Sequence, residues 1–235
     1  NVTSMKGMFQ DSSFNNASIK NWDLFRCEDL SYMFIGNKVF NQDLSWNTSN
    51  VTTMNNLFDK SNFNNASIKN WDLSSCENIS YMFNLNKVFN QSINKWNVNK
   101  VTSMQNMFTG ASNFNQPINT GELRGDYYPW DVSKVTNMSE MFKDTSFNQP
   151  LYYWTTNKVT TMSGMIENNP KFNQEIGTWI EDNYLYWDVS LVKDMSSMFK
   201  NARSFNRDIA KWNISNVTSM QKMFEGATLF DKYID

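Results

Sequence analysis

Few side chains in this sequence could do chemistry, and the commonest catalytic type is missing. The 235-residue chain contains no His, which is the usual general base and a frequent metal ligand. It also lacks G-x-S-x-G, a Walker phosphate-binding loop, the Rossmann glycine pattern and any Cys-x-x-Cys pair. We therefore expect a protein that is not an enzyme, with no metal site and no cofactor.

Two irregular segments are the strongest candidates for a binding site. They lie near residues 119–129 and 177–186, and both are rich in aromatic and acidic residues. Loops that leave a regular scaffold commonly carry binding residues, and aromatic side chains dominate many interfaces. The alternative is that these aromatics fold back and cover a neighbouring part of the protein. The candidate contact residues are Tyr127, Tyr128, Trp179, Tyr184 and Tyr186.

The first of these segments also contains Arg124, Gly125 and Asp126, a tripeptide that some adhesion receptors bind. Three-residue matches arise easily by chance, so the tripeptide alone assigns no function. A loop tip is nevertheless the setting in which it would be accessible, and we keep the three residues as binding candidates.

A third candidate is a polar stripe in which Asp alternates with a neutral residue. Such alternation keeps like charges about 10 Å apart and lets neighbouring side chains form hydrogen bonds. The stripe either solubilises one face and blocks unwanted sheet contacts, or forms a concave polar face for a protein, a glycan or a weakly held cation. Its members are Asp23, Asn47, Asp72, Asn97, Asp131, Thr155, Asp188 and Asn213.

An internal repeat positions all of these residues. Its clearest sign is the stretch NNASIKNWDL, which occurs at residues 15–24 and again at 64–73. The full unit reads V-T-x-M-x-x-M-F, then a polar turn, then F-N-x-x-I-x-x-W-D-V-S, with a common period of 24 or 25 residues. We predict a single array over residues 1–235 whose nine units begin near residues 2, 27, 51, 76, 101, 135, 159, 192 and 217.

Nearly every large apolar residue falls on this repeat. All 15 Met occupy the two Met positions, and 17 of the 18 Phe occupy the two Phe positions. Within a unit, Val2, Met5, Met8 and Phe9 have a spacing typical of a short helix, and the I-x-x-W-x-V stretch ends in the alternation of a strand. The expected fold is a repeat solenoid, with one short parallel strand and one short helix in each coil of about 25 residues.

Two further columns of residues are interpreted as structural. An Asn follows the second Phe of almost every unit, and a stacked amide could satisfy backbone groups of the buried turns. Cys27 and Cys76 replace the Val that opens a unit. They are two coils apart, about 10 Å, whereas a disulfide spans at most about 7 Å, so we expect buried free thiols.

The combined pattern resembles a known family of repeats. The stretches FNQDLSWNTSNVTTMNNLF and FNRDIAKWNISNVTSMQKMF carry Met, Phe, Asn and Trp in one phase. They are similar to the BspA-like surface-protein repeats, in particular to the repeat of roughly 25 residues in mycoplasma lipoproteins of unknown function. The resemblance covers essentially the whole chain. It implies a leucine-rich-repeat-like solenoid, an extracellular or cell-surface location or alternatively a virion surface, and roles in adhesion and binding.

Composition narrows the range of partners. A net charge of −2, with both signs spread along the chain, provides no basic stripe, so nucleic acid is not an expected partner. No apolar run approaches the roughly 20 residues that span a bilayer, and we expect no membrane insertion in this segment. The sequence begins in the middle of a unit, from which we expect a segment of a longer chain.

These observations rank three functional hypotheses. The first is a non-enzymatic, surface-displayed binding or adhesion module that recognises a protein or a glycan. The second is a structural role, in which the array is a spacer or an assembly or virion-decoration component that packs against other proteins, including copies of itself. Catalysis comes last, because nothing in the spacing converges acidic residues in one pocket.

Overall fold

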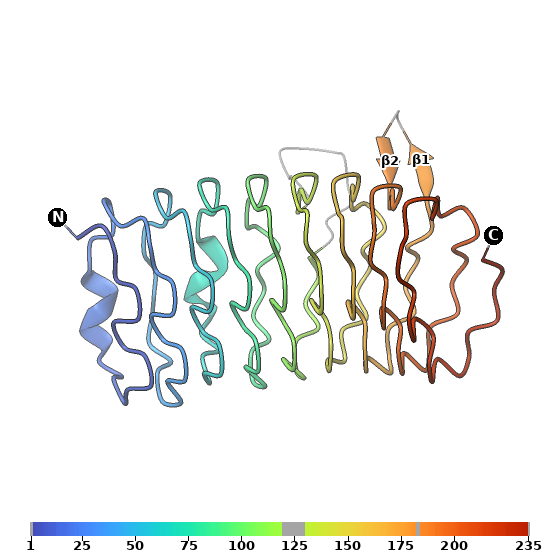
Figure 1. Cartoon of the computed structure of the whole chain (residues 1–235). Coiled ribbons are helices and arrows are strands. Elements are labelled where there is room, and N and C mark those ends of the chain that lie inside the picture. The colour runs from blue at the N-terminus through green and yellow to red at the C-terminus, as the bar shows by residue number, and fades with distance from the viewer. Residues whose placement is uncertain (1, 119–129, 182–183, 235) are drawn as a thin grey trace.

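The computed structural model describes residues 2–118, 130–181 and 184–234. Successive repeats lie side by side from the N-terminal to the C-terminal end (Figure 1). Isolated parallel backbone bridges join each repeat to the next, and equivalent residues of neighbouring repeats are therefore in register. The bridging residues are Ser4, Asp29, Thr53, Asn78, Ser103, Asn137, Thr161, Asp194 and Ser219.

The expected fold class is wrong in its secondary structure. A leucine-rich-repeat-like solenoid of about nine coils, each with a short helix and a short parallel strand, requires regular elements in every repeat. In the described part of the chain there is no α-helix, and the only sheet has two antiparallel strands, β1 (Trp179–Glu181) and β2 (Tyr184–Tyr186). Two short 3-10 helices, η1 (Ala17–Asn21) and η2 (Ala66–Asn70), complete the regular elements.

Backbone hydrogen bonds explain why the Met and Phe segment is not a helix. In the first repeat, Met5, Gly7 and Phe9 each donate their N–H to a carbonyl of the next repeat at 2.9 Å. The intervening residues close tight turns, as when Met8 N–H donates to Met5 O at 3.1 Å. An α-helix would direct these N–H groups to the fourth preceding residue. Because a chain that turns every three residues also brings every third side chain to one face, the Met spacing fits both conformations.

Two positions in each repeat have a positive φ, which a right-handed helix does not tolerate. One lies two residues after the first Met position, as in Asn56 (φ 57°), and the other four residues later, as in Lys60 (φ 54°). Glycine adopts this conformation freely and occupies some of these positions, including Gly110 (φ 68°). For other residues it costs about 1–2 kcal/mol, which the hydrogen bonds between repeats offset.

The strand expected at I-x-x-W-x-V is also absent from the part of the chain that the structure describes. Trp96 N–H donates to Ile93 O at 3.1 Å, which makes this stretch a tight turn rather than an extended strand. Both side chains still reach the interior, with at most 1% of their surface exposed, because a three-residue turn places them on the same side. Alternation over so few residues could not separate a strand from a turn.

The Trp side chains form a row through the interior, which we call the Trp row. Trp96 lies between Trp71 and Trp130, with ring centroids 6.2 and 6.4 Å away. Its indole N–H donates to Ile68 O of the preceding repeat at 2.9 Å, so that a buried polar group is satisfied. The equivalent bond is made by Trp46, Trp71, Trp130, Trp187 and Trp212.

Trp154 departs from this pattern. Its side chain is fully buried, yet its Nε1 has no hydrogen-bond partner among the described residues. By the register of the other repeats its acceptor would be Ile118 O, which directly precedes residues 119–129. An unsatisfied buried donor costs about 1–3 kcal/mol, so the row is locally weaker at this point.

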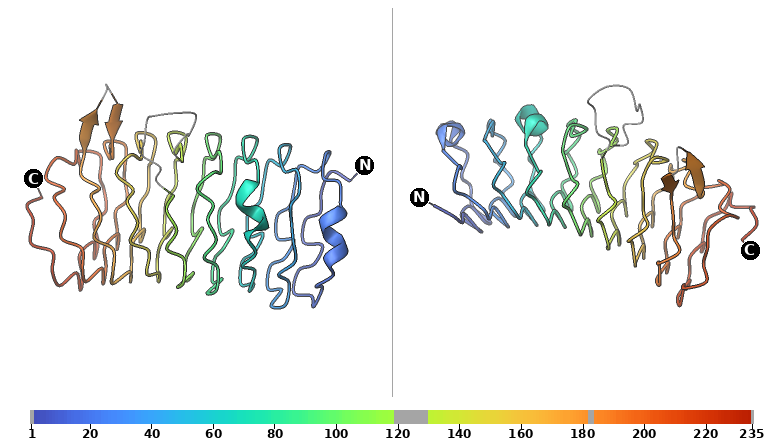
Figure 2. Two further views of the ribbon diagram at one scale, coloured as in Figure 1. Left: turned by 180° about the vertical axis from the view of Figure 1, so that it is seen from behind. Right: turned by 90° about the horizontal axis from the view of Figure 1, so that it is seen from above.

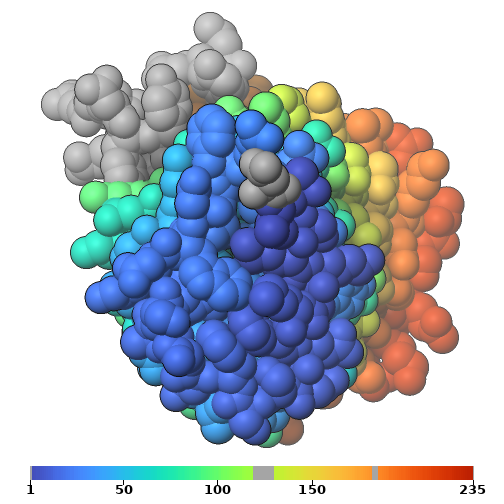
Figure 3. All heavy atoms as spheres, turned by 90° about the vertical axis from the view of Figure 1, so that its left-hand side faces the viewer, coloured from blue at the N-terminus to red at the C-terminus, as the bar shows by residue number. Residues whose placement is uncertain are grey.

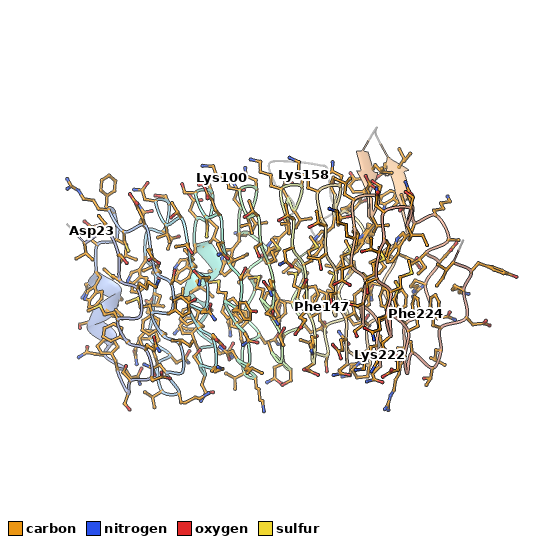
Figure 4. All side chains as sticks on the ribbon, viewed as in Figure 1. Asp23, Lys100, Phe147, Lys158, Lys222 and Phe224 are labelled. Atoms are coloured by element: carbon orange, nitrogen blue, oxygen red, sulfur yellow. The ribbon has the colours of Figure 1, made fainter. Side chains whose placement is uncertain are left out.

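Rows of Phe rings run beside the Trp row. Phe142 stacks on Phe147 of its own repeat at 4.2 Å and on Phe108 of the preceding repeat at 5.8 Å between centroids. Phe147 lies within the body of the molecule, whereas Lys100 and Lys158 lie at its edge (Figure 4). Aromatic burial repeated in this way contributes a large apolar area to the stability of the array.

The Asn column does what the sequence predicts. Asn64 Oδ1 accepts the backbone N–H of Asn90 at 2.9 Å and Nε2 of Gln91 at 3.0 Å. The same backbone bond links the other pairs of neighbouring repeats, from Asn15 to Asp231. The structural interpretation of this column is therefore confirmed.

The two cysteines are free and buried, which confirms the second structural prediction. Burial raises the pKa of the Cys76 thiol to about 12, although hydrogen bonds with the backbone of Asn78 and Met54 act in the opposite direction. Burial also raises the pKa of Cys27. Both thiols therefore pack as small apolar side chains in place of Val.

The row of repeats is bent rather than straight when seen from above (Figure 2). Seen from the N-terminal end, the first repeats cover those behind them, and later repeats emerge on one side (Figure 3). The β1–β2 hairpin rises from the same edge as Lys100 and Lys158 (Figures 1 and 4). This edge is where the described chain departs most from the plain repeat.

Candidate binding site beside the hairpin

The β1–β2 hairpin arises from the second irregular segment. It pairs Trp179 with Tyr186, Ile180 with Leu185 and Glu181 with Tyr184 in antiparallel register. Its outward side chains are unusually apolar, because Ile180 is 72% exposed and Leu185 is 36% exposed. A contiguous exposed apolar patch is typical of an interaction surface.

Four rings at the base of the hairpin form what we call the aromatic cluster: Tyr152, Tyr153, Trp179 and Tyr186. Trp179 stacks on Tyr186 with 4.7 Å between centroids and lies 5.6 Å from Tyr153. Its indole N–H donates to Tyr152 O at 2.9 Å. Tyr186 is only 6% exposed, whereas the other three rings are partly exposed. Tyr186 therefore supports Trp179, and Trp179 is one of the three rings that a partner can reach.

An open pocket of about 480 Å³ lies next to this cluster. This volume falls within the roughly 300–1,000 Å³ of small-molecule sites. Three successive repeats contribute to the pocket, so it depends on their register. Its lining residues are Tyr152, Glu175, Gly177, Thr178, Trp179, Asp208 and Lys211. Together with Tyr153 and Tyr186, these residues form the hairpin site.

The polar groups of the pocket are held by local contacts. Glu175 pairs with Arg207 at 2.7 Å between Oε1 and Nη1. Asp208 Oδ1 accepts the backbone N–H of Ala210 at 2.9 Å, and Thr178 Oγ1 donates to Trp187 O at 2.8 Å. Each carboxylate keeps a second oxygen for other partners, because a carboxylate accepts about four hydrogen bonds.

Gly177 allows the hairpin to approach the next repeat. A Cβ at this position would lie 2.6 Å from the carbonyl oxygen of Asp208, a contact that the backbone cannot relieve without moving. Glycine therefore brings Trp179 close to Asp208 and Lys211.

The polar stripe residues lie between the Trp and the Val of the I-x-x-W-x-V stretch, for which the sequence pattern predicts a strand with these side chains on its outer face. Its Asp and Asn members each accept the backbone N–H of the second following residue through Oδ1, at 2.8–3.2 Å. These are Asx turns, which Asp and Asn stabilise locally. The expectation that they lie on a strand is wrong, and each has one oxygen committed to its own turn. The residues concerned are Asp23, Asn47, Asp72, Asn97, Asp131, Asp188 and Asn213.

Several predicted contact residues fall outside the described part of the chain. They are Arg124, Gly125, Asp126, Tyr127 and Tyr128, together with the side chain of Tyr184. Of the predicted aromatic residues, the described structure thus brings together Trp179 and Tyr186 only.

The sequence patterns missed Tyr152 and Tyr153, although a signal for them existed. They occupy the two positions between the Ile-type and Trp residues, where plain repeats carry pairs such as Asn94 and Lys95. Two aromatics in place of polar residues, one repeat before an irregular segment, indicate a local surface. Glu175, Asp208 and Lys211 carried no such signal, because they fit the polar positions of the repeat.

Within residues 2–118, 130–181 and 184–234, no group of three or more Cys, Asp or Glu side chains is arranged to hold a metal ion. The same residues include no helix with the length and apolar character needed to cross a bilayer. The absence of enzymatic activity and of a cofactor stays a prediction.

The family model described as "Mycoplasma protein of unknown function, DUF285" matches residues 1–66, 45–126 and 180–235. The chain belongs to this family of mycoplasma-type repeat proteins. No curated protein and no solved structure matches the chain.

Proposed function

We propose that this chain is a non-enzymatic binding module, displayed at a surface, that contacts protein or glycan partners through the hairpin site. The observation that carries the proposal is the aromatic cluster beside an open pocket. It stands where the chain departs from its repeat, and Trp179 there lies outside the Trp row. Aromatic side chains that are not needed for the core are typical anchors of interfaces.

The contrast between Ile180 and the core supports this interpretation. A repeat protein gains nothing in stability from an exposed Ile in the middle of a hairpin strand, whereas the exposed pair Ile180 and Leu185 adds apolar contact area for a partner. The resemblance of the repeats to BspA-like surface proteins supports surface display and a role in adhesion. The alternative of a spacer or assembly component predicts that the hairpin site is dispensable.

The test compares beads that carry the intact chain with beads that carry a variant lacking the hairpin. In the variant, residues 177–186 are replaced by the two-residue Asn-Lys linker found at Asn94 and Lys95. We expect the intact chain to hold beads on cultured animal cells or matrix-coated surfaces, and the variant to release them. Equal retention of both, or retention of neither, would contradict the proposal.

A further inference from the structure

Building on the proposed function of the hairpin site, we infer that its pocket binds a neutral hexose in the pyranose form. A pyranose ring has a flat C–H face and a rim of hydroxyl groups. The pocket presents an aromatic wall next to hydrogen-bonding groups from a neighbouring repeat, which is the complementary arrangement.

Trp179 provides the apolar wall and is fixed in place. The ring of Tyr186 stacks on the indole of Trp179 with 4.7 Å between centroids. The hydrogen bond from Trp179 Nε1 to Tyr152 O holds the orientation of the indole ring. Because this N–H is already used, the indole offers a ligand mainly its apolar surface. A rigid aromatic surface loses little conformational entropy on binding, which favours weak, specific contacts with a sugar face.

Glu175, Asp208 and Lys211 provide the polar groups that would bind the hydroxyl groups of the sugar. The two carboxylates accept and the ammonium donates, so vicinal hydroxyl groups of a sugar can satisfy both kinds of group at once. Glu175 and Asp208 are already positioned by Arg207 and by the backbone of Ala210. Prior positioning of this kind lowers the entropy lost on binding.

The charges of the pocket favour a neutral ligand. Its charged lining residues are two carboxylates and one ammonium, and the guanidinium of Arg207 neutralises Glu175 at 2.7 Å. The four charges sum to zero, so an anionic or a cationic sugar gains no net Coulomb attraction. An acidic glycan or a basic peptide therefore has no advantage here.

The shape of the site also disfavours an extended peptide as the main ligand. A peptide would add to a free strand edge, but β1 and β2 each contain only three residues. The pocket instead lies between the hairpin base and the repeat of Asp208, at a separation set by Gly177. Peptide binding along the hairpin would be revealed by inhibition of bead retention with a hairpin-binding peptide.

The test is saturation-transfer NMR with methyl glycosides of glucose, galactose and mannose, added to the intact chain. We expect transfer to the ring C–H protons of at least one glycoside. Trp179→Ala should weaken its binding about tenfold or more, and Trp179→Phe should stay within about threefold of the native value. Gly177→Ala should also weaken binding, because the added Cβ would meet the carbonyl oxygen of Asp208 and displace the hairpin. Phe25→Ala is the matched control, since Phe25 is 62% exposed and contributes nothing to the pocket.

Charged sugars and soluble glycans separate the possible sources of the ligand. Glucuronate and glucosamine should bind no more tightly than the neutral glycoside, and an oligosaccharide ending in the preferred hexose should bind at least as well. Absence of transfer from every neutral glycoside, unchanged binding by Trp179→Ala, or a clear preference for a charged sugar would each overturn the inference.

This test can fail separately from the proposed function. If bead retention depends on the hairpin but neither methyl glycosides nor oligosaccharides inhibit it, the proposed binding function is supported and the proposed sugar ligand is contradicted. If glycosides bind but bead retention is unchanged when the hairpin is removed, the proposed sugar ligand is supported and the proposed binding function is contradicted. Inhibition by a hairpin-binding peptide alone would assign the site to a protein partner and overturn the sugar assignment.

Discussion

The Trp row and the hairpin site use the same kind of side chain in opposite situations. Trp96 is 1% exposed and meets an almost identical environment on both sides, with Trp71 and Trp130 as neighbours. Trp179 is partly exposed, and its ring neighbours are tyrosines at positions where plain repeats carry residues such as Asn94 and Lys95. The comparison indicates that regular positions stabilise the array and that irregular positions are free to bind.

The largest expected effect tests the stabilising role of the Trp row. Trp96→Ala removes a buried ring between two neighbours and the hydrogen bond to Ile68 O, so we expect a loss of about 3–5 kcal/mol in the free energy of unfolding. Trp22→Ala, in a partly exposed end repeat, should cost roughly 1–2 kcal/mol. Urea titration measures both, and equal losses would argue against stacking between nearest neighbours.

A second prediction uses the buried thiol of Cys76 as a probe of the interior. Its pKa rises from an ordinary 9.0 to about 12 in the folded state, so only the unfolded chain releases this proton just above pH 9. The corresponding stability is fully present below about pH 9 and is lost between about pH 9 and pH 12. From about pH 8 to about pH 10.5 the loss should reach about 2 kcal/mol.

The control is Cys76→Val, which restores the residue found at this position in most repeats. The difference in unfolding free energy between the native chain and this variant should change with pH by the stated amount, since other titrating groups are common to both. A constant difference over this pH range would show that the thiol is accessible to solvent.

A third prediction sharpens the comparison within the Trp row itself. Trp154→Phe removes an indole N–H that has no partner in the described chain, whereas Trp96→Phe breaks a bond to a buried carbonyl. The first substitution should be less destabilising by about 1–2 kcal/mol. Thermal unfolding of the two variants measures the difference. A larger loss of stability for Trp154→Phe than for Trp96→Phe would mean that the indole N–H of Trp154 has a hydrogen-bond partner.

The smallest expected effect concerns the hairpin. Replacing residues 177–186 by the two-residue linker removes exposed side chains such as Ile180 and Leu185, and it also removes the buried Tyr186. Because Tyr186 packs against rings of the aromatic cluster and the Trp row stays in place, the free energy of unfolding should change by less than about 1 kcal/mol. Urea titration of the variant checks this. A loss as large as that of Trp96→Ala would mean that the hairpin belongs to the stabilising core.

The sequence predicted side-chain positions better than backbone conformation. The period, the Asn column and the burial of both cysteines follow from residue types that recur in phase. The helix and strand were wrong because three-residue turns give the same apolar spacing, and because Tyr81 (φ 59°) and Leu85 (φ 53°) carry no local sign of a left-handed backbone. The backbone conformation is determined by hydrogen bonds between neighbouring repeats, and no local sequence pattern reveals these bonds.

The hairpin site was only partly predictable for a related reason. Trp179 stood outside the repeat and was visible at once, and the pair Tyr152 and Tyr153 differed from its equivalents. Asp208 and Lys211 belong to a following repeat and look ordinary there. They join the site only because register and Gly177 bring their repeat next to the hairpin.

Amide hydrogen exchange followed by NMR tests the central claim most directly, namely that bonds between repeats hold the interior while the hairpin lies outside it. Asn56 and Phe58 donate to carbonyls of the next repeat at 2.9 Å, and their amides should exchange only with global unfolding. The hairpin amides of Ile180 and Leu185 should exchange far faster. Hairpin amides as slow as those of Asn56 and Phe58, or interior amides that exchange like exposed ones, would contradict the account.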